Sequence, residues 1–307
     1  MKISVVVPTY RRTKDLARCL AALKKQIRHV DELWIIVRDT DEESHKFLSN
    51  FDKESLPLEI ATVTAVGVIA AMNIGLESCT GDIVAFTDDD AGPHPDWLEG
   101  IESYFLADPR VAGVGGRDWV YHGTELEDGA EPVVGKLQWF GRLIGNHHIG
   151  IGGARDVDVL KGVNMSFRRG AIAGLYFDTR MRGTGAQVHF EVIFCLALKQ
   201  RGWKLLYDSE IGVDHFRGDR FDEDQRDRFN HIAVLNAVHN ETLAILDYLS
   251  PTRRFVFLIW SLLVGTREAR GVVQWLRFLP KEGDIARQKL WACWLGRYQG
   301  WKTWLLP

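Results

Sequence analysis

The sequence is poor in cysteine and has no long apolar run. Its four cysteines are scattered over 307 residues, with no Cys-x-x-Cys pair and no histidine at zinc-ligand spacing. This pattern predicts reduced, structural thiols in a cytosolic setting and argues against a disulfide framework or a zinc site. No stretch reaches the length needed to cross a bilayer. The first residues are too briefly apolar for a signal peptide and suit a first strand better.

Charge is unevenly distributed, although the formal net charge is only −3. Residues 251–307 carry ten Lys or Arg and three acidic residues, which gives +7, so the preceding 250 residues carry −10. Six of the eleven tryptophans lie in the same basic segment. The acidic part would be repelled by nucleic acid, so we expect no such partner. The basic segment suits an anionic membrane surface, which we favour, or an interface with a second copy of the chain in a homodimer.

Strand-like and helix-like segments alternate in the first 115 residues. This alternation is typical of βαβ units around a parallel sheet, whose carboxyl strand ends gather at one edge. We therefore expect an α/β fold with a Rossmann-like, mostly parallel sheet flanked by helices. Residues 116–160 are rich in glycine and predict an ordered functional loop, and residues from 222 onward predict mainly helix. The expected strands of the first part are 3–7, 33–37, 58–63 and 83–87.

Three consecutive carboxylates, Asp88, Asp89 and Asp90, follow the apolar residues 83–87. The carboxyl end of a buried strand is where open α/β sheets place their ligands. Like charges about 4 Å apart repel by roughly 1 kcal/mol in water and about 4 kcal/mol at an effective dielectric of 20. Such a group is either well solvated or neutralised by a cation, and oxygen ligands suit Mg²⁺ or Mn²⁺. The alternative is an acidic turn or cap before a helix that begins near residues 93–98.

Several segments, in their order and spacing, resemble the family 2 glycosyltransferases, which have the nucleotide-diphospho-sugar transferase (GT-A) fold. The resemblance covers about residues 1–217. It implies a GT-A domain over residues 1–220, with a nucleotide-sugar-binding half (1–115) and an acceptor-side half (116–220). Residues 221–307 would then form a helical, basic, Trp-rich extension. The matching segments are VVVPTYRR (5–12), GVIAAMNIG (67–75), FTDDDA (86–91) and KGVNMSFRR (161–169).

The resemblance also implies an activity: inverting, metal-dependent transfer of a sugar from a UDP- or GDP-sugar to a hydroxyl of a glycan or lipid-linked acceptor. The expected setting is cell-surface polysaccharide synthesis at the cytoplasmic face of the membrane. The metal, Mg²⁺ or Mn²⁺, would be held by Asp88, Asp90 and His215. The acceptor would meet Gly162 and Asn164, and Glu191 would be the catalytic base. Contacts to the nucleotide sugar are expected from Pro8, Thr9, Tyr10, Arg11, Asp39, Asn73, Asp88 and Asp89.

The sequence departs from the common family pattern in two places. Glu191 stands where the family often has an aspartate, so the carboxylate is kept but its reach grows by one methylene. Met72 stands where the family often has a basic residue, which weakens a diphosphate contact there.

Several of these residues have structural alternatives. Asp39 could be a turn residue or the cap of a helix over 41–51. Asn164 could be a buried polar group, His215 an ordinary histidine at the edge of the core, and Glu191 part of an ion pair. Arg11 and Arg12 could be solvated or could approach phosphates.

Two rival functions remain open at this point. A sugar-1-phosphate nucleotidyltransferase would need a glycine-rich loop after the first strand, where this chain has Pro8, Thr9, Tyr10 and Arg11. A catalytically inactive sugar-nucleotide-binding protein is supported only by the glutamate at position 191. Neither the donor sugar nor the acceptor follows from these motifs, because loop shape determines both.

Overall fold

The computed structural model describes residues 1–52, 56–225 and 228–306. The chain forms two compact units. The first comprises Met1–Lys136, Ile144–Phe177 and Phe194–Asp219. The second comprises Leu137–Leu143, Asp178–Ile193 and Arg220–Pro307. The chain passes between the units several times, and one of these points falls inside a helix, α5 (Phe190–Gln200).

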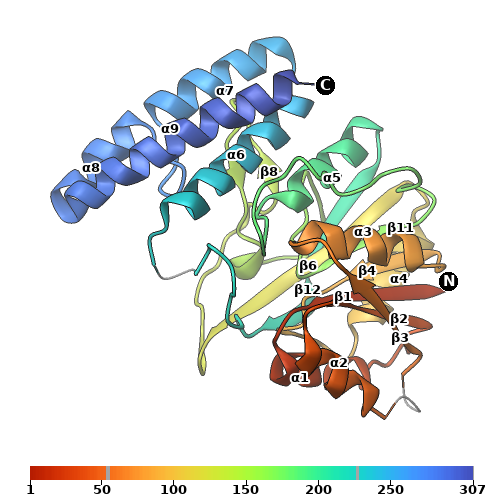
Figure 1. Ribbon diagram of the computed structural model, residues 1–307. Coiled ribbons are helices and arrows are strands. Elements are labelled where there is room, and N and C mark those ends of the chain that lie inside the picture. Colours follow the sequence, from red (N-terminus) through yellow and green to blue (C-terminus); the bar gives the residue numbers. More distant parts are fainter. Residues whose placement is uncertain (53–55, 226–227, 307) are drawn as a thin grey trace. The chain divides into compact units, whose positions relative to one another are not determined.

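A large mixed sheet forms the centre of the first unit (Figure 1), with the strand order β10-β12-β6-β11-β4-β1-β2-β3. The short strands β5 (Ala91–Pro93) and β7 (Glu125–Leu126) pair with β12 and β6. A separate ribbon contains β8 (Lys136–Leu137) and β9 (Leu143–Ile144). The strands of the main path are β1 (Ile3–Thr9), β2 (Glu32–Arg38), β3 (Leu58–Val63), β4 (Ile83–Phe86), β6 (Val111–His122), β10 (Arg155–Val157), β11 (Met165–Arg168) and β12 (Lys204–His215).

The strand directions confirm the predicted mostly parallel sheet. β1 runs parallel to both β2 and β4, and β2 runs parallel to β3. β11 is antiparallel to both β4 and β6, so β6 and its parallel neighbour β12 point the same way as β4. The carboxyl ends of β1, β2, β4 and β12 therefore lie at one edge of the sheet.

Helices cover the two faces of this sheet. Leu16, Leu20 and Leu23 on α1 (Thr13–Leu23) recur at helical spacing, and all three are buried. They share one core cluster with residues of α2 (Glu42–Ser49), α4 (Trp97–Ala107) and the inward side chains of β1. On the opposite face, α3 (Val68–Ser78) approaches β1 so closely that a Cβ on Gly75 would lie 2.3 Å from Val6 Cγ1.

Strand β6 corrects the expectation that a glycine-rich loop begins at residue 116, because residues 111–122 form one continuous strand. Its glycines are required by close packing. A Cβ on Gly116 would lie 1.9 Å from the carbonyl oxygen of Ile211, and a Cβ on Gly113 would lie 2.6 Å from Leu205 Cδ2. The glycines thus let β6 and β12 approach each other.

Four helices dominate the second unit: α6 (His231–Tyr248), α7 (Pro251–Leu263), α8 (Val272–Glu282) and α9 (Asp284–Leu305). Helix α9 packs along α6 through two glycines, because a Cβ on Gly296 or Gly300 would lie 2.6–2.7 Å from carbonyl oxygens of α6. In the described part of the chain, no helix combines the length and the apolar character that crossing a membrane requires.

The other side of α9 leaves aromatic side chains exposed. Trp291, Trp294, Tyr298 and Trp301 recur at helical spacing and all are exposed. From spacing alone the sequence predicts a helical stripe of Leu290, Trp291, Trp294, Leu295 and Tyr298, flanked by Arg287, Lys289, Arg297 and Lys302. Its three aromatic residues are exposed as expected, whereas the flanking Arg297 is buried. Helix α7 also leaves large apolar side chains in solvent, namely Phe255, Ile259, Leu262 and Leu263.

Arg297 forms a buried ion pair with Glu241 between α9 and α6. Its Nη2 lies 2.5 Å from Glu241 Oε2, with 3% and 9% of the two side chains exposed, and its Nη1 donates to Thr242 Oγ1 at 2.9 Å. Breaking a buried pair leaves an uncompensated charge, whereas replacing both partners by apolar groups is often neutral.

We therefore expect Arg297→Met to lower the free energy of unfolding by about 3–5 kcal/mol. The double variant Arg297→Met/Glu241→Leu should recover most of this loss. Urea unfolding followed by tryptophan fluorescence measures both. The control is Arg287→Met on the same helix, which breaks an exposed pair with Asp284 and should change stability by less than about 1 kcal/mol. A double variant as unstable as the single one would contradict the assignment.

Candidate functional site

The candidate site residues of the first unit gather at the carboxyl edge of the sheet. Thr9 ends β1, Asp39 follows β2, Asp88 follows β4 by two residues, and His215 ends β12. Side chains from four strands that are distant in sequence therefore share one edge.

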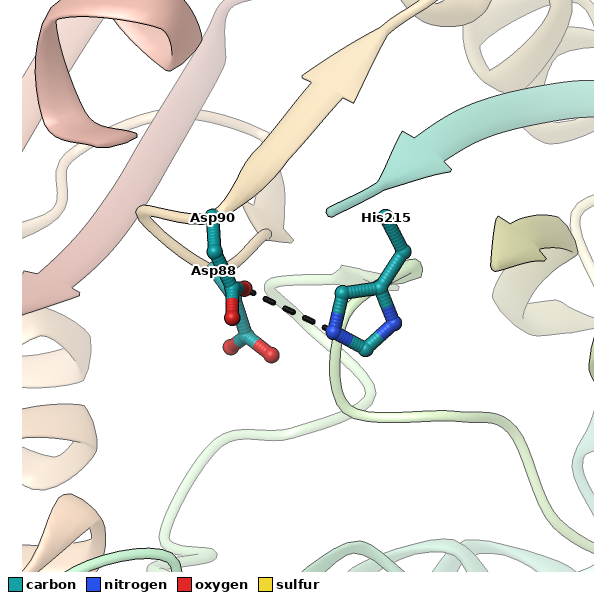
Figure 2. Close-up of side chains that lie close together, drawn as sticks. All are labelled: Asp88, Asp90 and His215. Atoms are coloured by element: carbon teal, nitrogen blue, oxygen red, sulfur yellow. Dashed lines mark ion pairs between the residues drawn. The ribbon is translucent and has the colours of Figure 1, made fainter. Parts of the chain in front are cut away.

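Asp88, Asp90 and His215 lie close together and are shown in Figure 2. Each offers one ligand atom, and these atoms all lie within 4.8 Å of one another. His215 Nε2 is 3.5 Å from Asp90 Oδ1. Both ring nitrogens of His215 are buried, and within the described residues neither makes a hydrogen bond. Two carboxylates and an imidazole with a free lone pair fit a divalent cation such as Mn²⁺ or Mg²⁺.

Asp89 points into a different environment from its two neighbours. It is completely buried, and Arg12 Nη2 lies 2.6 Å from Asp89 Oδ1. Thr9 Oγ1 donates to the other oxygen, Oδ2, at 2.7 Å. Both oxygens of this carboxylate thus have structural partners, and its contact with the nucleotide sugar stays a prediction. In this structure Asp89 links the Arg12 guanidinium to Thr9, the last residue of β1.

Arg12 also donates to Asp90 Oδ2 at 3.0 Å, so one guanidinium bridges two of the three carboxylates. The Arg12 side chain is mostly buried, so the solvated alternative does not describe it, and an approach to phosphates stays a prediction. Burial and the neighbouring Asp90 raise the pKa of Asp88, since both disfavour its charged form. Arg12 and His215 thus lie beside the acidic triplet and offset the repulsion between carboxylates that the sequence predicts.

Asp118, on β6, is a further buried carboxylate at the same edge. Its Oδ2 lies 3.7 Å from His215 Nδ1, on the opposite side of the ring from Asp90. Burial acts against its ionised form, but the nearby His215 and Lys161 together hold the pKa of Asp118 below its usual range. Asp118 was not among the predicted site residues.

The predicted donor-binding segment, Pro8 to Arg11, begins in the last two residues of β1 and continues directly after it. Pro8 and Thr9 are buried, and the Arg11 guanidinium lies over the Tyr10 ring, 5.0 Å from its centroid. Arg11 adopts a left-handed backbone conformation with φ 57°. Its amide donates to Asp41 Oδ2 at 2.5 Å, which fixes the turn.

Asp39 is neither the cap of the following helix nor fully paired. The cap of α2 is Asp41, whose Oδ1 accepts from the Ser44 amide at 3.1 Å. The side chain of Asp39 is 40% exposed and has Arg38 Nε at 3.6 Å. The cap alternative for Asp39 is therefore wrong, and its carboxylate faces solvent.

Two predicted site asparagines have structural partners. Asn164 is completely buried, accepts from Trp97 Nε1 and donates to the Ile211 carbonyl, both at 2.9 Å. The structure thus favours the buried-polar alternative for Asn164 over acceptor contact. Asn73 exchanges two hydrogen bonds, at 2.8 and 2.9 Å, with the backbone of Phe177. Gly162 is buried within the tight turn that precedes Asn164.

Glu191 lies in the first turn of α5, within the second unit. It is half-buried, while every residue of α5 from Val192 to Leu198 is buried. Among the described residues Glu191 makes no hydrogen bond and no ion pair, so the structural ion pair that the sequence left open does not form there. A half-buried carboxylate without a partner is available for proton transfer.

The backbone that leads into Glu191 is strained and held in place. Gln187 and His189 have positive φ angles of 41° and 74°, which side chains other than glycine rarely adopt. Asn240 on α6 donates to the carbonyls of Arg182 and Val188 at 2.9 and 3.1 Å. Such strain persists only where the surroundings over-determine it, and it often occurs at functional sites.

The same segment is tied to two acidic residues that precede α6. Asp222 accepts from the Ala186 amide at 2.8 Å, and Glu223 accepts from the Thr184 amide at 3.2 Å. The approach to Glu191 is therefore fixed by the C-terminal segment of the chain.

Comparison with known proteins agrees with this geometry. The model of glycosyl transferase family 2 matches residues 4–195. The glucosyl-dolichyl phosphate glucuronosyltransferase of Haloferax volcanii is 28% identical over 226 residues, which cover 70% of this chain and 69% of that protein. The amylovoran biosynthesis glycosyltransferase AmsE of Erwinia amylovora is 32% identical over 127 residues, or 40% of this chain and 48% of its own length.

Two solved structures are similar over nearly the whole chain. S. aureus TarS 1–349 in complex with UDP-GlcNAc has a TM-score of 0.59 at 14% identity, over 99% of this chain and 89% of that one. The mannosyltransferase PcManGT of Pyrobaculum calidifontis, in complex with GDP-Man and Mn²⁺, has a TM-score of 0.55 at 16% identity, over 99% and 87%. At such identities these structures show the fold alone, which is the GT-A fold. The chain belongs to glycosyl transferase family 2 and is a glycosyltransferase.

Proposed function

We propose that this chain moves a sugar from a nucleotide-diphospho-sugar to a hydroxyl of a lipid-linked or polysaccharide glycan, with inversion and with a divalent cation. The observation that carries the proposal is the meeting of Asp88, Asp90 and His215 at the carboxyl edge of the sheet. The names of similar proteins support the classes of substrate: one acts on a glucosyl-dolichyl phosphate, and others bind UDP-GlcNAc or GDP-Man.

Asp88, Asp90 and His215 would hold the Mg²⁺ or Mn²⁺ ion. The ion, when bound, supplies Lewis acidity that stabilises the departing diphosphate. Residues 1–115 would form the donor side and residues 116–220 the acceptor side. The exposed Asp39 carboxylate would accept hydrogen bonds from the nucleobase, and Tyr10 and Arg11 would line the donor loop beside it.

Glu191 would act as the base. Its carboxylate accepts the proton of the acceptor hydroxyl while the acceptor oxygen forms a bond to the anomeric carbon. The bond from that carbon to the diphosphate oxygen breaks on the opposite side, so the nucleoside diphosphate leaves and the configuration inverts. The lack of any partner for Glu191 among the described residues supports this assignment.

A donor panel tests the function. We expect slow release of UDP or GDP when the protein is incubated with one sugar nucleotide of a panel and Mn²⁺ or Mg²⁺, because water can replace the acceptor. EDTA should abolish the release, and added metal should restore it; chromatography of the nucleotides measures both. Formation of a nucleoside triphosphate from added pyrophosphate would instead indicate a nucleotidyltransferase. Binding of a donor without any turnover would indicate an inactive sugar-nucleotide-binding protein.

The base assignment predicts the effect of Glu191→Gln. Turnover should fall by about 10²–10⁴, the usual loss when a general base is removed, while the donor dissociation constant stays nearly unchanged. Steady-state kinetics and calorimetric donor titration measure the two quantities.

Two further variants sharpen this test. Glu191→Asp restores the carboxylate common in the family and should keep far more activity than the glutamine variant. The matched control is Glu99→Gln, which also changes a glutamate in the first turn of a helix, α4, and should leave turnover unchanged. Equal turnover in the wild type and Glu191→Gln would defeat the assignment.

We further propose that the extension over residues 221–307 binds the anionic cytoplasmic face of a membrane. The exposed aromatic stripe of α9 and the exposed apolar residues of α7 offer a surface that prefers the membrane interface. The +7 charge of residues 251–307 is complementary to anionic headgroups, each nearby Lys or Arg adding about 1 kcal/mol. The charge favours a membrane over a second copy of this chain, which would carry the same charge.

Vesicle sedimentation tests the membrane proposal. We expect binding to vesicles that contain anionic phospholipid, weak binding to neutral vesicles, and release by salt. The double variant Trp291→Ser/Tyr298→Ser should bind about tenfold more weakly or worse, since each ring buries apolar area in the interface. The control is Tyr176→Ser, because Tyr176 and Tyr298 are both 56% exposed and Tyr176 lies in the first unit. Unchanged binding together with a stable homodimer in solution would favour the dimer interface.

A further inference from the structure

Asp118 is a buried carboxylate that the proposed mechanism does not use. It lies on β6 and is 2% exposed, and within the described residues its Oδ1 makes no hydrogen bond. Burying a carboxylate with one oxygen left without a hydrogen bond lowers the stability of the fold. We therefore expect a carboxylate at such a place to serve a function that offsets this cost.

The pairing of β6 with β12 brings Asp118 to His215. Asp118 is in register with Val213, and the two strands run parallel, so the side chain two residues further along β12 comes within its reach. Asp118 Oδ2 lies 3.7 Å from His215 Nδ1. This approach depends on the small residues of β6, because a Cβ on Gly116 would collide with the backbone of β12.

The two nitrogens of the His215 ring face two different carboxylates. Nε2 lies toward Asp90 Oδ1 at 3.5 Å, within the cluster of Asp88, Asp90 and His215, whereas Nδ1 lies toward Asp118. A neutral imidazole carries one proton, and the nitrogen that binds a metal must be the other one. Histidines that bind metals almost always donate their second N–H to a carboxylate, a carbonyl or water, which fixes both tautomer and ring orientation.

We propose that Asp118 is the positioning residue of the metal site: it accepts the Nδ1 proton of His215 and so turns the Nε2 lone pair toward Asp88 and Asp90. The inference rests on the proposed function, since it assumes that this cluster holds a divalent cation. A closing movement of less than about 1 Å brings Oδ2 and Nδ1 to hydrogen-bond distance.

The test is the affinity of the Asp118→Asn variant for Mn²⁺, measured without donor or acceptor by the electron paramagnetic resonance signal of free Mn²⁺. Loss of such a partner typically weakens metal binding by about 10- to 100-fold, and we expect a dissociation constant raised by that factor. The melting temperature, recorded in EDTA, should stay near that of the wild type. A structural role alone would lower the melting temperature without this selective loss of affinity.

Two control variants distinguish the positioning role of Asp118 from the metal site itself and from the general effect of changing a buried carboxylate. His215→Ala removes the imidazole itself and should bind Mn²⁺ at least as weakly as Asp118→Asn. Asp208→Asn changes another buried carboxylate, on β12, whose partner is Tyr104, and should keep wild-type affinity. An Asp118→Asn variant that binds Mn²⁺ within twofold of the wild type overturns the positioning role but leaves the metal site intact. A wild-type protein that binds no Mn²⁺ overturns the metal site and this inference together.

A second measurement needs no variant and applies if Asp118→Asn does not fold. Long-range ¹H–¹⁵N spectra of the Mg²⁺-loaded wild type report the tautomer of each histidine, and selective labelling with a His215→Gln comparison assigns the signal. We expect the proton of His215 on Nδ1. A proton on Nε2 would contradict the proposal.

Discussion

Mutual repulsion among carboxylates at one edge of the sheet is the constraint around which the site is built. Asp88, Asp89 and Asp90 cannot share one poorly solvated place without a partner. The chain resolves this by separating them: Asp89 turns inward to Arg12 and Thr9, while Asp88 and Asp90 turn toward His215. Because Arg12 also reaches Asp90, it links the structural carboxylate to the cluster that we assign to the metal.

The close approach of β6 and β12 is the second condition for this arrangement. Strand β12 ends at His215. Its position relative to the triplet follows from its direct pairing with β5, where His215 lies opposite Ala91, and from its pairing with β6, which reaches β4 through β11. Glycine at positions 113 and 116 makes the pairing sterically possible. The glycine-rich sequence therefore forms a tightly packed strand, β6. The same strand places Asp118 beside the His215 ring, on the side away from Asp90.

In the second unit, small residues decide which side of a helix is buried. Gly296 and Gly300 place one side of α9 against α6, and the buried pair of Arg297 and Glu241 lies on that side. The large aromatic residues are left on the other side, where they form the surface that we assign to a membrane. At the middle of α6, Asn240 holds the strained segment that leads to Glu191, so the C-terminal helices also help to position the proposed base.

Local patterns in the sequence determined the α/β class and the parallel strands β1 to β4, because hydrophobic period is a local property. They also predicted that Trp291, Trp294 and Tyr298 share one side of a helix. The grouping of Asp88 and Asp90 with His215 was implied by the family resemblance alone, and the structure brings the three residues together. The tertiary structure alone decided that Asp89, Asn73 and Asn164 have structural partners, since burial depends on what packs against a side chain. It also decided that Gly113 and Gly116 lie in a strand and that Arg12 and Asp118 adjoin the acidic cluster, because these contacts join residues that are far apart in the chain.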